Sequence, residues 1–95
     1  MDYYVYILAN KTNVAIYIGV TNHLVRRIYE HKHHADPSSH TAKYGIDKLV
    51  YFEATQSSYT AISREKQLKG WNRQRKNRMI TEHNPTWEDL YETLL

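Results

Sequence analysis

The residues of this chain that could do chemistry are two short tyrosine-containing segments, an arginine, a histidine and a glutamate. The segments are Tyr4-Val5-Tyr6 and Tyr17-Ile18-Gly19, and they are followed by Arg27, His31 and, much later, Glu65. A phenol can act as a base, a guanidinium is a fixed cation, and a carboxylate can hold a metal ion. Together these groups are the parts needed to break a phosphodiester bond.

The two tyrosine segments have the composition of β-strands, in which every second side chain lies on the same face of a sheet. Tyr4 and Tyr6 then share a face of one strand, and Tyr17 and Gly19 share a face of the other. Gly19 has no side chain and leaves space for a ligand or a backbone to approach. The chain has nine tyrosines, and the alternative is that these aromatic residues serve only as core or cross-strand pairs.

Arg27 and His31 are four residues apart, so on a helix they project along the same side. An arginine there can recognise a phosphate with its planar donors, and a histidine can accept a proton near neutral pH. The alternative is an ordinary helix surface on which Arg27 pairs with Glu30.

Glu65 shares one helix face with Ala61 and Leu68. These two apolar side chains should point toward a sheet, and a carboxylate drawn to the same side must be paired, hydrogen-bonded or bound to a metal ion. The alternative is a surface glutamate that pairs with Lys69 one turn later.

The expected secondary-structure elements follow the order ββαβαα, which predicts an α/β (α+β) fold with a small three-stranded sheet covered by helices. Strands are expected at residues 3–9, 14–20 and 49–54. Helices are expected from a cap at Thr21 or Asn22 to about Ala35, from a cap at Ser57 or Ser58 to Gly70, and from about Asn72 to Glu82. Residues 40–45 are expected to be irregular or a short helix, and Pro85 or Thr86 should open a last helix with an apolar stripe of Trp87, Leu90, Tyr91 and Leu94.

Composition limits the class of protein. At 95 residues we expect a single domain at residues 1–95, with a core at about 1–83 and a C-terminal helix at 84–95. The absence of cysteine excludes disulfides and thiolate metal sites. No apolar stretch reaches membrane-spanning length and the N-terminus does not read as a signal peptide, so we expect a cytoplasmic protein that does not bind a membrane.

Positive charge is concentrated in one part of the chain. The formal net charge is only +3, yet the stretch from Arg64 to Arg78 contains a single acid, Glu65, among Arg64, Lys66, Lys69, Arg73, Arg75, Lys76 and Arg78. Such asymmetry suits a polyanionic partner bound on one side of the domain. The alternative is a solvated helix face without a partner.

In their order and spacing, these residues resemble the GIY-YIG endonuclease superfamily, especially its small stand-alone bacterial members. Tyr4-Val5-Tyr6 stands in the place of the first motif, and Tyr17-Ile18-Gly19 reproduces the second. Arg27 follows Tyr17 by ten residues, and His31 comes four residues later. The run 61–71 looks like the glutamate-bearing helix of the family.

This resemblance implies a nuclease that hydrolyses phosphodiester bonds in nucleic acid with the help of one divalent metal ion. Glu65 would hold the ion, expected to be Mg²⁺ or Mn²⁺, and Arg27 would grip the scissile phosphate. Tyr6 would act as the base or assist it, with Tyr17 and His31 in the same network.

Other residues would support the site or the substrate. Gly19 would leave room at the site, and Asn77 matches a supporting polar residue of some relatives. Nucleic acid, DNA in preference to RNA, would lie against the basic side chains of Arg64, Lys66, Lys69, Arg73, Arg75 and Lys76.

The sequence also departs from the family pattern. Tyr4 replaces the glycine of the first motif, and Val20 stands where several repair nucleases have a lysine. One phosphate-facing cation is therefore absent.

Three other interpretations remain open. The domain could bind nucleic acid without cutting it. It could hold zinc through His31, His33 and His34, although no cysteine supports such a site. It could also be a scaffold that pairs with another protein through an exposed helix at residues 87–95.

Overall fold

The computed structural model describes all 95 residues and is built on a three-stranded antiparallel sheet with the strand order β2-β1-β3. The strands are β1 (Tyr3–Ala9), β2 (Ile16–Thr21) and β3 (Lys48–Thr55). β1 and β2 form a hairpin, and β1 lies in the centre of the sheet. The predicted hairpin and third strand are confirmed, with ends that differ by at most two residues.

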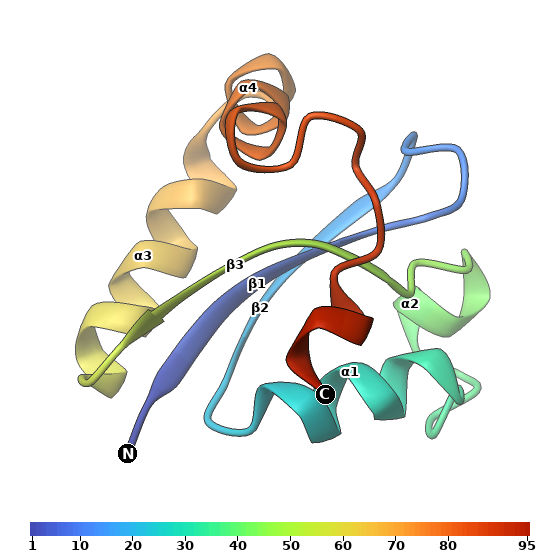
Figure 1. Ribbon diagram of the computed structural model, residues 1–95, viewed down its shortest axis with the longest axis horizontal. Helices are drawn as coiled ribbons and strands as arrows, with labels where there is room; N and C mark the ends of the chain where they lie inside the picture. Colours follow the sequence, from blue (N-terminus) through green and yellow to red (C-terminus); the bar gives the residue numbers. More distant parts are fainter.

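Helices cover both faces of the sheet (Figure 1). α1 (Leu24–Lys32) and a 3₁₀ turn, η1 (Tyr91–Leu94), lie on one side, and α3 (Ser58–Gly70) and α4 (Arg73–His83) lie on the other. The segment after α1 contains a short helix, α2 (His40–Lys43). The predicted α+β architecture and its ββαβαα order are confirmed, with α2 as the short helix between α1 and β3. No helix combines the length and the apolar character needed to cross a membrane.

The central strand β1 is buried on both faces and divides the core into two clusters. On one face Val5, Ile7 and Ala9 pack against residues of α3 and α4. On the other face Tyr6 and Leu8 pack against α1. Since side chains alternate along a strand, Tyr6 necessarily faces α1 when its neighbours Val5 and Ile7 face α3.

The start of α1 differs from the prediction. Thr21 is still part of β2, and its hydroxyl accepts the backbone N–H of His23 at 3.1 Å. His23 is the residue that caps α1, because its Nδ1 accepts the backbone N–H of Arg26 at 3.4 Å. The predicted cap at Thr21 or Asn22 and the predicted end near Ala35 are therefore wrong, and α1 ends at Lys32.

On the other face of the sheet, α3 and α4 each begin directly after a residue whose side chain caps the helix. Ser57 caps α3 by accepting the backbone N–H of Thr60 at 3.3 Å, and α3 ends at Gly70. Asn72 caps α4 by accepting the backbone N–H of Arg75 at 2.8 Å. Each cap satisfies one of the backbone donors that a helix start leaves unpaired.

The residues after Asn84 do not form the predicted apolar helix. Only the four residues of η1 are helical, and Trp87 has a positive φ of 52°. Asn84 explains the difference, because its buried side chain donates to the carbonyls of Val50 (3.1 Å) and Glu88 (2.9 Å) and accepts the Glu88 N–H (3.2 Å). These three bonds hold residues 84–88 against β3 in a non-helical conformation.

The C-terminal segment then covers the free edge of β3. The N–H of Leu90 donates to the carbonyl of Leu49 at 2.8 Å, and the Leu49 N–H donates to the Asp89 carboxylate at 3.2 Å. Asp89 also forms an ion pair with Lys32 of α1. The scaffold alternative required an exposed helix at residues 87–95, and it loses its basis because this segment packs on the protein's own sheet.

Replacing Asn84 by alanine should lower the free energy of unfolding by about 2 kcal/mol, because it leaves the buried Val50 carbonyl without its side-chain partner and removes two bonds to the backbone of Glu88. Urea unfolding at equilibrium measures this loss. Glu82→Ala, at an exposed position of α4, is the control and should change the stability by less than about 0.5 kcal/mol. Equal unfolding midpoints for both variants would contradict the role given to Asn84.

Candidate active site

Tyr6 and Gly19 lie directly opposite each other in the pairing of β1 with β2. A Cβ atom at Gly19 would lie 2.5 Å from the Tyr6 hydroxyl oxygen and 2.6 Å from its Cζ. Side chains do not approach each other so closely. The missing side chain at Gly19 is therefore what allows the Tyr6 ring to lie across the neighbouring strand.

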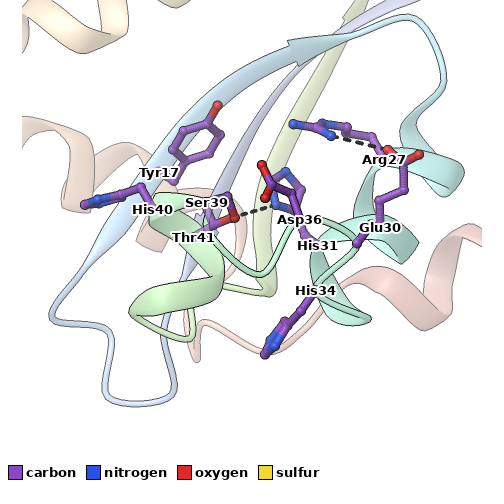
Figure 2. A pocket seen from close by; sticks show the side chains of 10 residues that line it. Tyr17, Arg27, Glu30, His31, His34, Asp36, Ser39, His40 and Thr41 are labelled. Atoms are coloured by element: carbon purple, nitrogen blue, oxygen red, sulfur yellow. Dashed lines mark hydrogen bonds and ion pairs between the residues drawn. The ribbon is translucent and has the colours of Figure 1, made fainter.

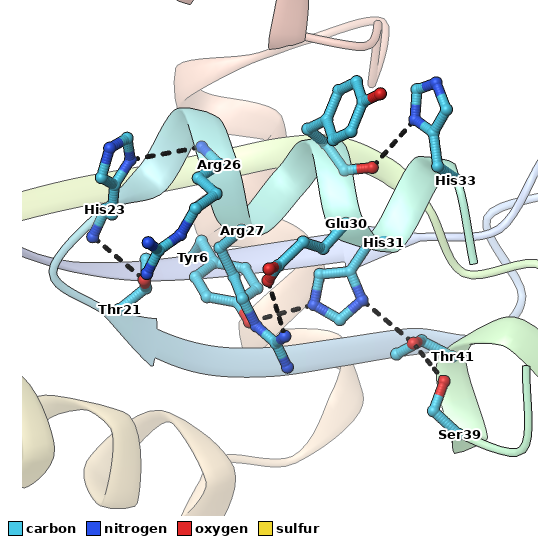
Figure 3. A network of polar contacts seen from close by, with 11 residues as sticks. Tyr6, Thr21, His23, Arg26, Arg27, Glu30, His31, His33, Ser39 and Thr41 are labelled. Atoms are coloured by element: carbon cyan, nitrogen blue, oxygen red, sulfur yellow. Dashed lines mark hydrogen bonds and ion pairs between the residues drawn. The ribbon is translucent and has the colours of Figure 1, made fainter. Parts of the chain in front are cut away.

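The Tyr6 hydroxyl meets the imidazole of His31 on α1 (Figure 3). The distance from the phenol oxygen to His31 Nε2 is 3.2 Å, and both residues are buried. Tyr17 of β2 completes a group of three rings, whose centroids are separated by 6.3 Å (Tyr6–Tyr17), 5.9 Å (Tyr6–His31) and 5.8 Å (Tyr17–His31). The structure brings these three predicted residues together.

The surroundings keep Tyr6 protonated at neutral pH. Burial raises the pKa of the Tyr6 phenol, the Arg27 guanidinium opposes this rise, and Tyr17 and Glu65 add to it. A phenol with a raised pKa holds its proton more firmly and needs an acceptor within reach before it can serve as a base. His31 is such an acceptor.

His31 is held in its neutral form. Burial lowers the pKa of the imidazole and the positive charge of Arg27 lowers it further, while the carboxylates of Glu30 and Asp47 act in the opposite direction. A neutral imidazole has one nitrogen that donates and one that accepts. The network therefore contains a proton acceptor at pH 7.

Arg27 lies between two hollows of the surface. Its Nη1 donates to the Glu30 carboxylate at 3.3 Å, so the pairing considered from sequence does occur. Its side chain nevertheless stays 43% exposed, which leaves donors free for an anion. The guanidinium lines a first hollow that contains Tyr17 and His31, and a second one at the start of α3.

The first hollow (Figure 2) has a volume of about 380 Å³ and is lined largely by polar side chains. Four of them were not singled out from sequence: Asp36, Ser39, His40 and Thr41. They lie on α2 and on the loop before it, where the chain shows no apolar periodicity. Their spacing carried no signal, since only the fold of this loop brings them to His31.

Glu65 belongs to the helix layer on the other face of the sheet from α1 and lines neither of the two hollows. It lies on α3, on the same helix face as the buried Ala61 and Leu68, and its side chain is 21% exposed. It pairs with Lys69 at 3.5 Å, as the alternative interpretation anticipated. No hydrogen bond joins Glu65 to the three rings, but its charge acts on the Tyr6 phenol.

The second hollow connects the two sides of the sheet at the β2 edge. It lies between Arg27 of α1 and the α3 residues Ser58 and Ile62. Glu65 follows Ile62 by three residues, nearly one helical turn. The Arg27 guanidinium lines this hollow, and the Glu65 carboxylate comes from the helix on its other side, one turn beyond the lining residue Ile62.

Several predicted basic residues make contacts within the protein. Arg64 donates to the Glu53 carboxylate at 2.7 Å. Arg73 donates to the carbonyls of Asn13 and Val14, both at 2.7 Å, and so ties α4 to the turn between β1 and β2. These two guanidinium groups therefore stabilise the fold, in addition to any contact with nucleic acid.

The other residues of this stretch differ in their surroundings. Arg75 stacks on Trp71 at 3.8 Å from the ring centroid, whereas Lys66 and Lys76 form no ion pair. Asn77 accepts a hydrogen bond from Arg73 Nε at 2.8 Å. Its contact is thus with α4 itself and not with Tyr6, Arg27 or the other members of the site.

The three histidines considered for zinc point to different partners. His31 faces Tyr6, the His33 ring stacks on Tyr29 at a centroid distance of 3.9 Å, and His34 lies 3.9 Å from Asp47. No group of three or more histidine, cysteine, aspartate or glutamate side chains is arranged to hold a metal ion. The zinc interpretation is therefore wrong.

Comparison with known proteins agrees with the fold. Residues 2–80 match the family described as the GIY-YIG catalytic domain. The chain belongs to this family, which is a family of nucleases, and the resemblance noted from sequence is confirmed.

The relatives are proteins of similar size. The chain is 38% identical over 78 residues to a UPF0213 protein of Clostridium perfringens, which covers 82% of each chain. It is 30% identical over 82 residues to a UPF0213 protein of Limosilactobacillus reuteri, covering 85% of this chain and 84% of that protein. The solution NMR structure of a UPF0213 protein from Bacillus halodurans is similar with a TM-score of 0.59 and 29% identity, over 94% of this chain and 93% of that one.

Replacing Gly19 by alanine should lower the free energy of unfolding by about 1–3 kcal/mol, because the new methyl group overlaps the Tyr6 ring. Gly70→Ala is the matched control, since nothing lies within 4 Å of a Cβ atom at that position. The control should be neutral or stabilise by up to about 1 kcal/mol. Chemical denaturation of both variants measures the difference, and equal stabilities would show that Gly19 does not make room for the phenol.

Proposed function

We propose that this protein is a divalent-metal-dependent nuclease that hydrolyses phosphodiester bonds in nucleic acid, with DNA as its first expected substrate. The observation that carries the proposal is the convergence of Tyr6, His31 and Arg27 beside Gly19, with Glu65 close enough to influence the Tyr6 phenol. A binding surface alone would not need a buried base and its acceptor beside a cation. Membership of a nuclease family supports the same conclusion.

The residues at the β2 edge fit one divalent ion of the Mg²⁺ or Mn²⁺ type. Such ions bind through one or two protein carboxylates and complete their shell with water and phosphate oxygens. Glu65 offers one carboxylate, whose only ion pair is with Lys69, a side chain 53% exposed. A pair of this kind is weak and is readily exchanged for a cation. The ion would neutralise the phosphate and stabilise the departing oxygen.

Arg27 would position the scissile phosphate. Its planar donors match two phosphate oxygens, and the negative charge on these oxygens grows as the reaction proceeds. Because Arg27 lines both hollows, a bound strand would pass over the guanidinium at the β2 edge. Glu30, which pairs with Arg27 in the absence of substrate, would exchange with that phosphate.

Tyr6 and His31 would handle the proton of the attacking water. As the water oxygen bonds to phosphorus, its proton goes to the Tyr6 oxygen, and the original phenol proton goes to His31 Nε2, 3.2 Å away. The bond from phosphorus to the leaving oxygen then breaks. Tyr6 thus acts as a base without existing as a free phenolate, which its raised pKa makes rare at pH 7.

A module that binds nucleic acid without cutting it is the second candidate. Two observations favour it, namely the engagement of Arg27 by Glu30 and the presence of Val20 in the place of a lysine. Binding and cleavage are separable in one experiment, because a metal ligand is needed only for the second.

The test is a panel of end-labelled DNA and RNA oligonucleotides, linear, nicked and branched, incubated with Mg²⁺, Mn²⁺ or EDTA. We expect metal-dependent cleavage that falls by a factor on the order of 10² or more in Glu65→Ala and in Arg27→Ala. Glu65→Ala should still bind the oligonucleotide.

Glu82→Ala removes one carboxylate from an exposed site of α4 and is the control for the change in charge. It should cut like the wild type. Activity that survives unchanged in both active-site variants would come from a contaminant, and oligonucleotide binding without cleavage under any condition would establish the binding module instead.

A further inference from the structure

The Tyr6–His31 pair is the inner end of a longer chain of hydrogen bonds that leads to the surface (Figure 3). His31 Nδ1 lies 3.0 Å from Thr41 Oγ1, and Thr41 Oγ1 lies 3.3 Å from Ser39 Oγ. Thr41 is buried and Ser39 is half-buried. This chain of hydrogen bonds therefore runs from a buried phenol, through His31 of α1, to a hydroxyl at the start of α2.

These hydrogen bonds can run in either direction, because hydroxyl groups donate or accept and the proton of a neutral imidazole is on either nitrogen. In the outward arrangement the neutral Tyr6 phenol donates to His31 Nε2, and the imidazole proton is on Nδ1. Nδ1 then donates to Thr41, and the Thr41 hydroxyl donates to Ser39. Ser39 accepts this bond together with the backbone N–H of Ala42 at 3.2 Å, and its own proton is free to face solvent.

We propose that Thr41, supported by Ser39, is a positioning residue that fixes the tautomer of His31 and passes the Tyr6 proton on toward solvent. This inference rests on the proposed function of Tyr6 as the base. It adds a role for Thr41 of α2 and for Ser39, the residue that caps α2. It also gives the loop between α1 and β3 a part in the reaction.

The proton movements balance along the hydrogen bonds from Tyr6 to Ser39. When Tyr6 gives its proton to His31 Nε2, the Nδ1 proton moves to Thr41 Oγ1, the Thr41 proton moves to Ser39 Oγ, and the Ser39 proton leaves to water. Each group gains one proton as it loses one (the imidazole gains at Nε2 and loses at Nδ1), so no buried group has to carry a lasting charge. An imidazolium at His31 would be costly in this buried place beside Arg27.

The charged groups around these hydrogen bonds are compatible with proton transfer along them. The charged and titratable groups that act on His31 are Arg27, Glu30 and Asp47, and those that act on Tyr6 are Arg27, Tyr17 and Glu65. None of them is hydrogen-bonded to Thr41. The threonine hydroxyl therefore has His31 and Ser39 as its only side-chain partners.

The first test measures the His31 tautomer by ¹⁵N NMR of the imidazole and needs no enzymatic activity. In the wild type we expect the proton on Nδ1. In Thr41→Val, which keeps the shape of the side chain and removes the hydroxyl, we expect the Nε2-protonated form to increase. A wild-type protein with the proton on Nε2, or a Thr41→Val protein with the wild-type tautomer, would overturn the inference.

The second test compares cleavage by Thr41→Val and Thr41→Ser. We expect kcat to fall by about 10-fold or more in Thr41→Val and to stay within about twofold of the wild type in Thr41→Ser, because proton transfer requires the hydroxyl and not the methyl group. Equal activity of Thr41→Val and wild type would contradict the relay. If the wild type cuts nothing, the proposed function fails, whereas the NMR result still decides the position of the proton.

Discussion

The pairing of Tyr6 with Gly19 across the β1–β2 hairpin is the constraint on which the site depends. Because side chains alternate along a strand, a slip of one residue would turn Tyr6 away from α1 and toward α3. With the observed register, the phenol occupies the space that a side chain at position 19 would fill. The hydrogen bond to His31 then offsets the cost of burying the hydroxyl group.

Contacts from α4 and β3 support the turn of this hairpin. Arg73 of α4 binds the carbonyls of Asn13 and Val14, and Lys48 of β3 donates to the Asn13 side chain at 2.7 Å. Asn13 has a positive φ of 62°, so the hairpin turn needs such support. Part of the basic stretch therefore stabilises the hairpin that carries Tyr6 and Gly19, which links the outer helix layer to the geometry of the site.

Local sequence patterns were sufficient to predict the three strands and a cap of α3 at Ser57 or Ser58, since these features depend on residue periodicity and on nearby side chains. The cross-strand pairing of Tyr6 with Gly19 came only from the structure. They failed at the C-terminus, where the apolar spacing of Trp87 and Leu90 suggested a helix. There a single buried amide, Asn84, binds three backbone groups and overrides the local preference. No local pattern indicates the bond that ties this segment to β3, because Val50 is 34 residues away from Asn84.

The candidate site could also be predicted only in part from the sequence, because its residues come from elements that are distant along the chain. Helical spacing could place Glu65 on the sheet-facing side of its helix, but only the observed packing of α3 on the sheet shows that its charge acts on the Tyr6 phenol. The contribution of Thr41 depends on a short helix whose position is set by tertiary contacts. The sequence could therefore suggest these residues only separately, and the structure was needed to show which of them lie together.

The central claim is that Glu65 and the Tyr6–Arg27 cluster belong to one site for a divalent ion. Paramagnetic broadening of backbone amide signals by substoichiometric Mn²⁺ tests it most directly. We expect the signals of Gly19, Arg27 and Glu65 to broaden first in the wild type and to stay sharp in Glu65→Ala. Broadening centred on another acidic region, such as Glu88 and Asp89, or unchanged broadening in the variant, would contradict the claim.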